Sequence, residues 1–215
     1  MDGSGRMAIM HTRDFDKEAA GWDSNPMRVK LTGDIAVALA HTIKLKPEME
    51  VLDFGCGSGL LTLFLAPFVK SVTALDSSRG MLDVLEKKIA DQKITNVKPL
   101  YWDVVNTKSL IGKYHLLTAS MALHHVDDVA GLINIFYDHL LPGGFLAIAD
   151  LDLDNGLFHE DKSGVFHNGF DRERIKSYFK KFGFRDIAVS DAAIVNKPVA
   201  GVLKKFTVFL TAGKK

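Results

Sequence analysis

VLDFGCGSGLLT, residues 51–62, is the stretch of sequence that decides the fold. Its first four residues form an apolar run typical of a buried strand, and the residues from Leu60 on have the composition of a helix. Between them, Gly55, Gly57 and Gly59 follow the spacing G-x-G-x-G, which lets the backbone turn tightly and exposes amide groups. The stretch is therefore either a loop that binds an anionic or carboxylate-bearing ligand or a tight strand-to-helix turn without a ligand.

Strands and helices alternate on both sides of this loop. Apolar runs bounded by turn residues predict strands at residues 51–54, 72–75, 97–101, 115–120, 144–149, 184–189 and 206–211. Apolar residues at helical spacing predict helices at residues 32–43, with Thr32 as N-cap, and at 60–68, 79–91, 129–140 and 172–182. The alternation predicts an α/β fold with a largely parallel sheet, whose strand carboxyl ends meet at one edge where ligands bind.

Length and composition limit the partners of the chain. The 215 residues, 47% of them hydrophobic, are expected to form a single domain over 1–215, with an N-terminal arm over 1–31. The 27 basic and 26 acidic side chains nearly cancel, which disfavours a nucleic-acid partner, and no apolar run is long enough to span a membrane. The single cysteine, Cys56, suits a reducing compartment, so a cytoplasmic protein is expected, either a monomer or a homodimer.

Two nucleotide-binding patterns fit the glycine loop poorly. The dinucleotide fingerprint needs its third glycine where this chain has Leu60, which disfavours a nicotinamide cofactor, and no Gly-Lys-Ser/Thr follows for a P-loop. Two carboxylates follow neighbouring strands instead. Asp76 can either accept hydrogen bonds from the hydroxyls of a ribose or cap the next helix. Asp103 can either accept a hydrogen bond from an exocyclic amine or form a turn.

Five segments in the order VLDFGCGSG, ALDSS, YWDVV, TASMALHHV and LLPGGFLAIADL resemble the motifs of the class I S-adenosylmethionine-dependent methyltransferases, from about Val51 to the C-terminus. The resemblance implies a Rossmann-like, mostly parallel seven-stranded sheet with an antiparallel last strand, and S-adenosylmethionine as methyl donor. It assigns cofactor contacts to Asp53, Gly55, Cys56, Gly57, Asp76, Ser77, Met81, Asp103, Val104 and Ala119.

The segment DFDKEAAGWDSNPMRV, residues 14–29, is similar to the start of small-molecule members of that family, in which the N-terminal arm folds over the cofactor. This likeness implies that Trp22 belongs to a lid over the cofactor site. Ordinary packing of Trp22 against the first predicted helix is the alternative.

Methyl transfer from a sulfonium is an in-line displacement that needs alignment and exclusion of water rather than a nucleophilic side chain. An acceptor that carries a proton and is not already ionised is also helped by a general base. His124 and His125 are the candidates for this base, and structural roles are the alternative.

Residues 151–170 follow the fifth strand, where the family places substrate-binding insertions. The candidate substrate contacts there are His159, Phe166 and His167, although a solvated polar loop pinned by its aromatic residues is the alternative. No two histidines have zinc spacing, so no metal site is expected.

We expect methyl transfer to a small-molecule acceptor. A non-catalytic S-adenosylmethionine-binding regulatory subunit, a protein or RNA methyltransferase and a nicotinamide oxidoreductase are the alternatives. Methylation of nucleic-acid bases is disfavoured because Ser120-Met121-Ala122-Leu123 replaces the Asn/Asp-Pro-Pro-aromatic motif of those enzymes.

Overall fold

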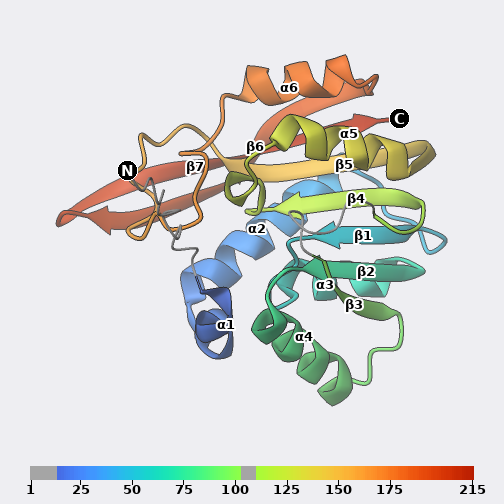
Figure 1. Ribbon diagram of the computed structural model, residues 1–215, viewed down its shortest axis with the longest axis horizontal. Coiled ribbons are helices and arrows are strands. Elements are labelled where there is room, and N and C mark those ends of the chain that lie inside the picture. Colours follow the sequence, from blue (N-terminus) through green and yellow to red (C-terminus); the bar gives the residue numbers. More distant parts are fainter. Residues whose placement is uncertain (1–13, 103–109) are drawn as a thin grey trace, which may run out of the picture.

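The computed structural model describes residues 14–102 and 110–215, which build one seven-stranded sheet of order β3-β2-β1-β4-β5-β7-β6 (Figure 1). The first five strands in this order run parallel, whereas β7 is antiparallel to both β5 and β6. The strands are β1 (Glu50–Phe54), β2 (Ser71–Asp76), β3 (Val97–Tyr101), β4 (Tyr114–Ser120), β5 (Leu140–Leu151), β6 (Arg185–Val199) and β7 (Val202–Lys214). The predicted fold is confirmed.

Helices cover both faces of the sheet and bury its apolar residues. One face packs against α5 (Val129–His139) and α6 (Arg172–Lys181), through side chains such as Phe136 and Phe179. The other face packs against α2 (Pro26–Thr42), α3 (Leu60–Leu65) and α4 (Arg79–Asp91), through Leu39, Leu65 and Leu85. No helix in the described part of the chain is both long and apolar enough to cross a membrane.

The N-terminal arm is shorter than expected because α2 begins at Pro26. Asn25 is the N-cap of this helix, and its side-chain oxygen accepts a hydrogen bond from the amide of Met27 at 3.0 Å. Pro26 stands in the first turn, where its missing N–H costs nothing. The predicted start at Thr32 is therefore wrong. In the part of the arm that the structure describes, α1 (Phe15–Glu18) and the 3-10 helix η1 (Ala19–Ser24) lie beside α4.

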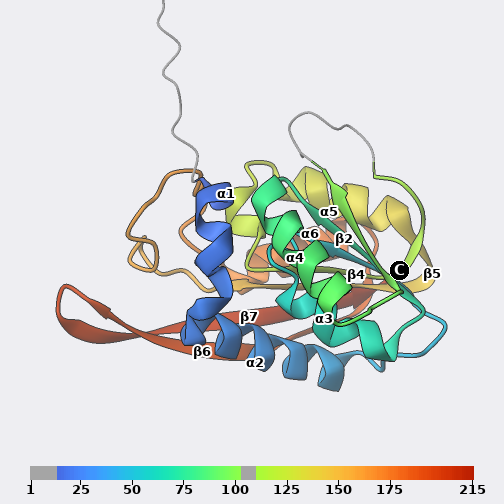
Figure 2. The same ribbon diagram turned by 90° about the horizontal axis from the view of Figure 1, so that it is seen from below.

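The last two strands are much longer than predicted and form a hairpin that projects beyond the rest of the sheet (Figure 2). Its turn residues Ala200 and Gly201 both have positive φ, 49° and 78°, as a two-residue hairpin turn of the primed type requires. An alanine at the first turn position gives little sequence signal. The residues just before this turn reach the site described next.

Candidate functional site

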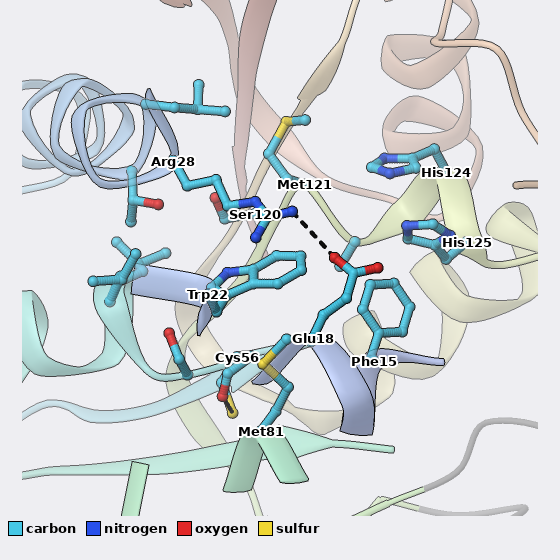
Figure 3. Close-up of a pocket in the computed structure, with 18 of the residues that line it drawn as sticks. Phe15, Glu18, Trp22, Arg28, Cys56, Met81, Ser120, Met121, His124 and His125 are labelled. Carbon is cyan, nitrogen blue, oxygen red and sulfur yellow. Dashed lines mark hydrogen bonds and ion pairs between the residues drawn. The ribbon is translucent and has the colours of Figure 1, made fainter. Parts of the chain in front are cut away.

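The carboxyl ends of the parallel strands open into a cavity of about 780 Å³ (Figure 3). The glycine loop after β1 and the ends of β2 and β4 line one side of it. The opposite side comes from α1, α2, the segment 158–161 and the hairpin residues 195–198. Volume and enclosure of this kind are typical of small-molecule sites.

Two of the three glycines in the loop, Gly57 and Gly59, have different surroundings. Both have positive φ, 53° at Gly57 and 84° at Gly59, a conformation that disfavours other residues. A Cβ atom at Gly59 would lie 2.3 Å from a methyl carbon of Leu85, so this glycine lets the loop pack against α4. A Cβ atom at Gly57 would meet nothing within 4 Å. Gly57 therefore presents bare backbone to the cavity and leaves room for a ligand.

Asp76 closes the loop from the end of β2. Its carboxylate accepts hydrogen bonds from the amides of Gly57 at 2.7 Å and Ser78 at 2.8 Å. The N-cap of α4 is Ser78, whose hydroxyl accepts from the amide of Met81 at 3.1 Å, so Asp76 does not cap that helix. Burial raises the pKa of Asp76 above its ordinary value, opposed by the backbone hydrogen bonds. The carboxylate lines the cavity with lone pairs left to accept further hydrogen bonds.

Asp53 lies deeper, at the base of the cavity. Its side chain is buried and accepts hydrogen bonds from the hydroxyls of Thr62 at 2.6 Å and Thr118 at 2.8 Å. Thr118 is the residue that pairs with Asp53 across β1 and β4, so the sheet register brings the two together. Burial raises the pKa of Asp53 to about 6, opposed by the hydrogen bonds from the two threonines.

The arm is anchored to the glycine loop and to α4 by two acidic residues. Asp16 accepts hydrogen bonds from the hydroxyl of Ser78 at 2.5 Å and from the amide of Gly80 at 2.8 Å. Asp23 accepts from the hydroxyl of Ser58 at 2.6 Å and also pairs with Lys88. The arm thus lies over the edge of the cavity.

Trp22 faces this cavity rather than only packing against the helix. The guanidinium of Arg28 stacks on its ring at 3.7 Å and also bonds to the carboxylate of Glu18 at 3.1 Å (Figure 3). The geometry fits the predicted lid, since all three side chains line the cavity.

The two histidines after β4 have different partners. Nδ1 of His124 lies 2.7 Å from the buried carboxylate of Asp150, at the end of β5. Nδ1 of His125 lies 2.7 Å from the carbonyl oxygen of Gly164, and its ring packs edge-on against Phe15. Both histidines line the cavity, at its far side from the glycine loop.

Most of the predicted site residues lie together in this cavity. Those that line it are Trp22, Asp53, Gly55, Cys56, Gly57, Asp76, Ser77, Met81, His124, His125 and His159. Asp103 and Val104 lie outside the described residues. The Cys56 thiol is buried among residues of α4 and the sheet, and burial raises its pKa, which suits a structural side chain.

Three predicted residues do not line the cavity. Ala119 is buried in the core beneath it, and the next residues, Ser120, Met121 and Ala122, form the wall instead. Phe166 and His167 are held on the far side of the β4 turn, where their amides donate to the carbonyl oxygen of His124 at 2.9 and 3.2 Å. These three side chains lie apart from the cavity, and their contacts with cofactor or substrate stay predictions.

Sequence reasoning missed residues that reach the cavity from distant segments. These are chiefly Glu18 and Arg28 near the arm and the hairpin residues 195–198. It also missed Asp150, which does not line the cavity but contacts His124 from behind. The motif LLPGGFLAIADL contains Asp150, and its acidic residue at a strand end was an available signal. Among the described residues, no cluster of three potential metal ligands occurs.

Comparison with known proteins identifies the class. A family model described as "Methyltransferase domain" matches residues 27–189, well over half of the sequence. The chain belongs to this methyltransferase-domain family. The class predicted from the five motifs, the class I S-adenosylmethionine-dependent methyltransferases, is thereby confirmed.

Individual relatives agree with this assignment. An uncharacterized methyltransferase of Schizosaccharomyces pombe is 30% identical over 191 residues, which cover 81% of this chain and 65% of the relative. Trans-aconitate 2-methyltransferase of Deinococcus radiodurans is 34% identical over 112 residues, which cover 51% of this chain and 41% of that protein.

Among solved structures, phosphoethanolamine N-methyltransferase 2 of Haemonchus contortus, in complex with S-adenosyl-L-methionine, shares the fold. The TM-score is 0.69 at 17% identity, over 95% of this chain and 60% of that one. The chain thus spans less than two thirds of the length of each of these three relatives.

Proposed function

We propose that this protein transfers a methyl group from S-adenosylmethionine to a small-molecule acceptor bound in the same cavity. The observation that carries the proposal is the two-sided cavity, in which the glycine loop and Asp76 form one wall and His124 and the hairpin lie on the other. Family membership supports the methyl donor, since S-adenosylmethionine is the donor of this class.

The residues of the first wall fit such a donor. The open space at Gly57 admits its aminoacyl end beside Gly55 and the deeper Asp53, and the Asp76 carboxylate accepts hydrogen bonds from the ribose hydroxyls. Ser77 and Met81 flank the adenine, and Trp22 covers the site. When bound, the donor supplies an electrophilic methyl carbon and leaves as a neutral thioether.

The second wall favours a small acceptor. Segment 158–161, with His159, and the hairpin residues 195–198 join α2 around this part of the cavity, and the ammonium of Lys197 donates to the carbonyl oxygen of Phe158 at 2.7 Å. The arm further restricts the opening. One relative and one protein of similar structure are named for small acceptors, trans-aconitate and phosphoethanolamine.

Calorimetric titration with S-adenosylmethionine, S-adenosylhomocysteine and NADH tests the donor. Binding of the two adenosyl ligands in the micromolar range without NADH binding supports the proposal, and tight NADH binding contradicts it. Replacing Asp76→Ala should weaken S-adenosylhomocysteine binding by about 1–3 kcal/mol. Asp83→Ala, which removes an exposed carboxylate of α4 that does not line the cavity, is the matched control.

The acceptor is tested with methyl-labelled S-adenosylmethionine and cell extract divided by size. Label transferred to products in the low-molecular-mass fraction supports a small acceptor. Transfer only to the macromolecular fraction would support a protein or RNA acceptor, and donor binding without any transfer would support a regulatory subunit.

A further inference from the structure

Asp150 and His124 form a buried pair that the cofactor site does not explain. The Asp150 side chain has no exposed surface, yet it accepts four hydrogen bonds. One oxygen accepts from the amides of Leu123 at 3.0 Å and His124 at 3.3 Å. The other lies 2.7 Å from the amide of Leu151 and 2.7 Å from Nδ1 of His124.

These contacts define the protonation of the pair. Burial alone raises the pKa of Asp150, but the attraction to His124 when that ring is protonated, together with the hydrogen bonds of His124 and the backbone amides, outweighs it, so the pKa lies below its ordinary value. An ionised carboxylate has no proton to donate, so Nδ1 of His124 must be the donor in this bond. In the neutral imidazole, Nε2 then has a lone pair and can accept a proton.

The imidazole of His124 is also fixed in direction. Its ring centroid lies 4.2 Å from that of His125 and 4.8 Å from that of His159, so one neighbouring imidazole comes from the same turn and the other from segment 158–161. His124 lines the cavity on the side away from the glycine loop (Figure 3). Nε2 is at the opposite edge of the ring from Nδ1 and is therefore directed away from Asp150. Among the described residues, His125 and His159 are the titratable groups whose rings contact it, and Glu18, Glu160 and Asp161 line the same cavity.

We propose that His124 accepts the proton of the methyl acceptor and that Asp150 is the positioning residue that fixes its tautomer. The acceptor then belongs to the class with an O–H or N–H group at the reacting atom, rather than a carbon or thioether nucleophile. This inference rests on the proposed function.

The proton and electrons balance within the cavity. The acceptor's O–H or N–H bond breaks, its proton binds Nε2 of His124, and the electron pair left on the acceptor atom supports the new bond to the methyl carbon. The bond between that carbon and sulfur breaks with its electrons kept by sulfur. The resulting imidazolium is stabilised by the Asp150 carboxylate until it releases the proton to water.

The first test is nitrogen-15 NMR of the histidine side chains with S-adenosylhomocysteine bound. At pH 8 we expect His124 as the neutral tautomer protonated at Nδ1, and we expect Asp150→Asn to change that tautomer population. Finding His124 protonated at Nε2 overturns the proposal without affecting donor binding. This measurement needs no acceptor and remains possible with the unmodified chain if Asp150→Asn fails to fold.

The second test is transfer of labelled methyl groups to the low-molecular-mass extract fraction. His124→Asn places an amide nitrogen where Nδ1 lies, keeping the bond to Asp150 while removing Nε2. Transfer by the unmodified chain should fall towards acidic pH. His124→Asn should abolish that fall, reduce transfer by about 100-fold or more, and leave S-adenosylhomocysteine affinity within about twofold. His125→Asn, the matched control, should keep that acidic fall.

Equal loss of transfer in both variants, or an unchanged pH profile in His124→Asn, contradicts the proton-acceptor role. Failure of the unmodified chain to bind S-adenosylhomocysteine would instead contradict the proposed function. The two failures are therefore distinguishable.

Discussion

The two walls of the cavity are built in different ways. The wall from the parallel strands consists of backbone and carboxylates that follow consecutive strands, and the register of β1 and β4 alone places Thr118 beside Asp53. The opposite wall depends on contacts between distant segments, such as Lys197 with Phe158 and Arg28 with Glu18. The wall proposed to bind the donor is thus determined by local sequence and sheet topology, and the wall proposed to bind the acceptor by tertiary packing.

The largest expected effect distinguishes two glycines within the first wall. Gly59→Ala should lower the free energy of unfolding by about 2–5 kcal/mol, because the positive φ disfavours alanine and the new Cβ overlaps Leu85. Gly57→Ala should cost only about 1–2 kcal/mol, since its Cβ meets open space, but should weaken S-adenosylhomocysteine binding at least about tenfold. Urea denaturation and calorimetry measure both. Equal losses of stability would show that Gly57 is not open to the cavity.

The second prediction concerns the buried carboxylate at the base of the same wall. Because burial raises the pKa of Asp53 to about 6 from 3.8, the folded chain retains a proton that the unfolded chain has released between these values. The free energy of unfolding therefore falls as pH rises through this range, by up to about 3 kcal/mol. Asp53→Asn should remove this term and be more stable than the unmodified chain at pH 7.5 but not at pH 4. A stability difference independent of pH would contradict the assignment.

The residues that line the first wall could be grouped from the sequence because they lie in short patterns at the ends of predicted strands. The glycine spacing and Asp76 follow strands whose order and direction obey the rules of α/β folds. The predicted strands of the hairpin are too short because β6 is an edge strand with mixed polar and apolar residues. Alanine at position 200 is also not a typical turn residue, so the turn gives little signal in the sequence. The positions of Phe166 and His167 depend on a backbone contact with His124 that no local pattern encodes.

The third prediction tests the second wall where the 151–170 segment begins. Arg172 donates two hydrogen bonds of 2.6 Å to the carboxylate of Asp152, which also accepts from Thr207 of the hairpin at 2.5 Å. Arg172→Met should lower the free energy of unfolding by about 1–3 kcal/mol and leave S-adenosylhomocysteine affinity unchanged. Chemical denaturation and calorimetry check this. Arg174→Met on the exposed side of α6 is the control, and a donor-affinity loss specific to Arg172→Met would show that the walls are coupled.

The smallest effect is expected at the anchor of the arm, which joins the two walls. Asp16 bonds to Ser78 and Gly80 without lining the cavity, so Asp16→Asn should loosen the arm while leaving the ligand contacts intact. We expect S-adenosylhomocysteine affinity to fall by about fivefold, equivalent to the loss of about 1 kcal/mol. Asp14→Asn alters the neighbouring N-cap of α1, which bonds to Lys17 and does not line the cavity, and should leave affinity unchanged. If calorimetry shows the same affinity for both variants, the arm is not held over the donor by Asp16, and the lid must depend on the stack of Arg28 on Trp22 instead.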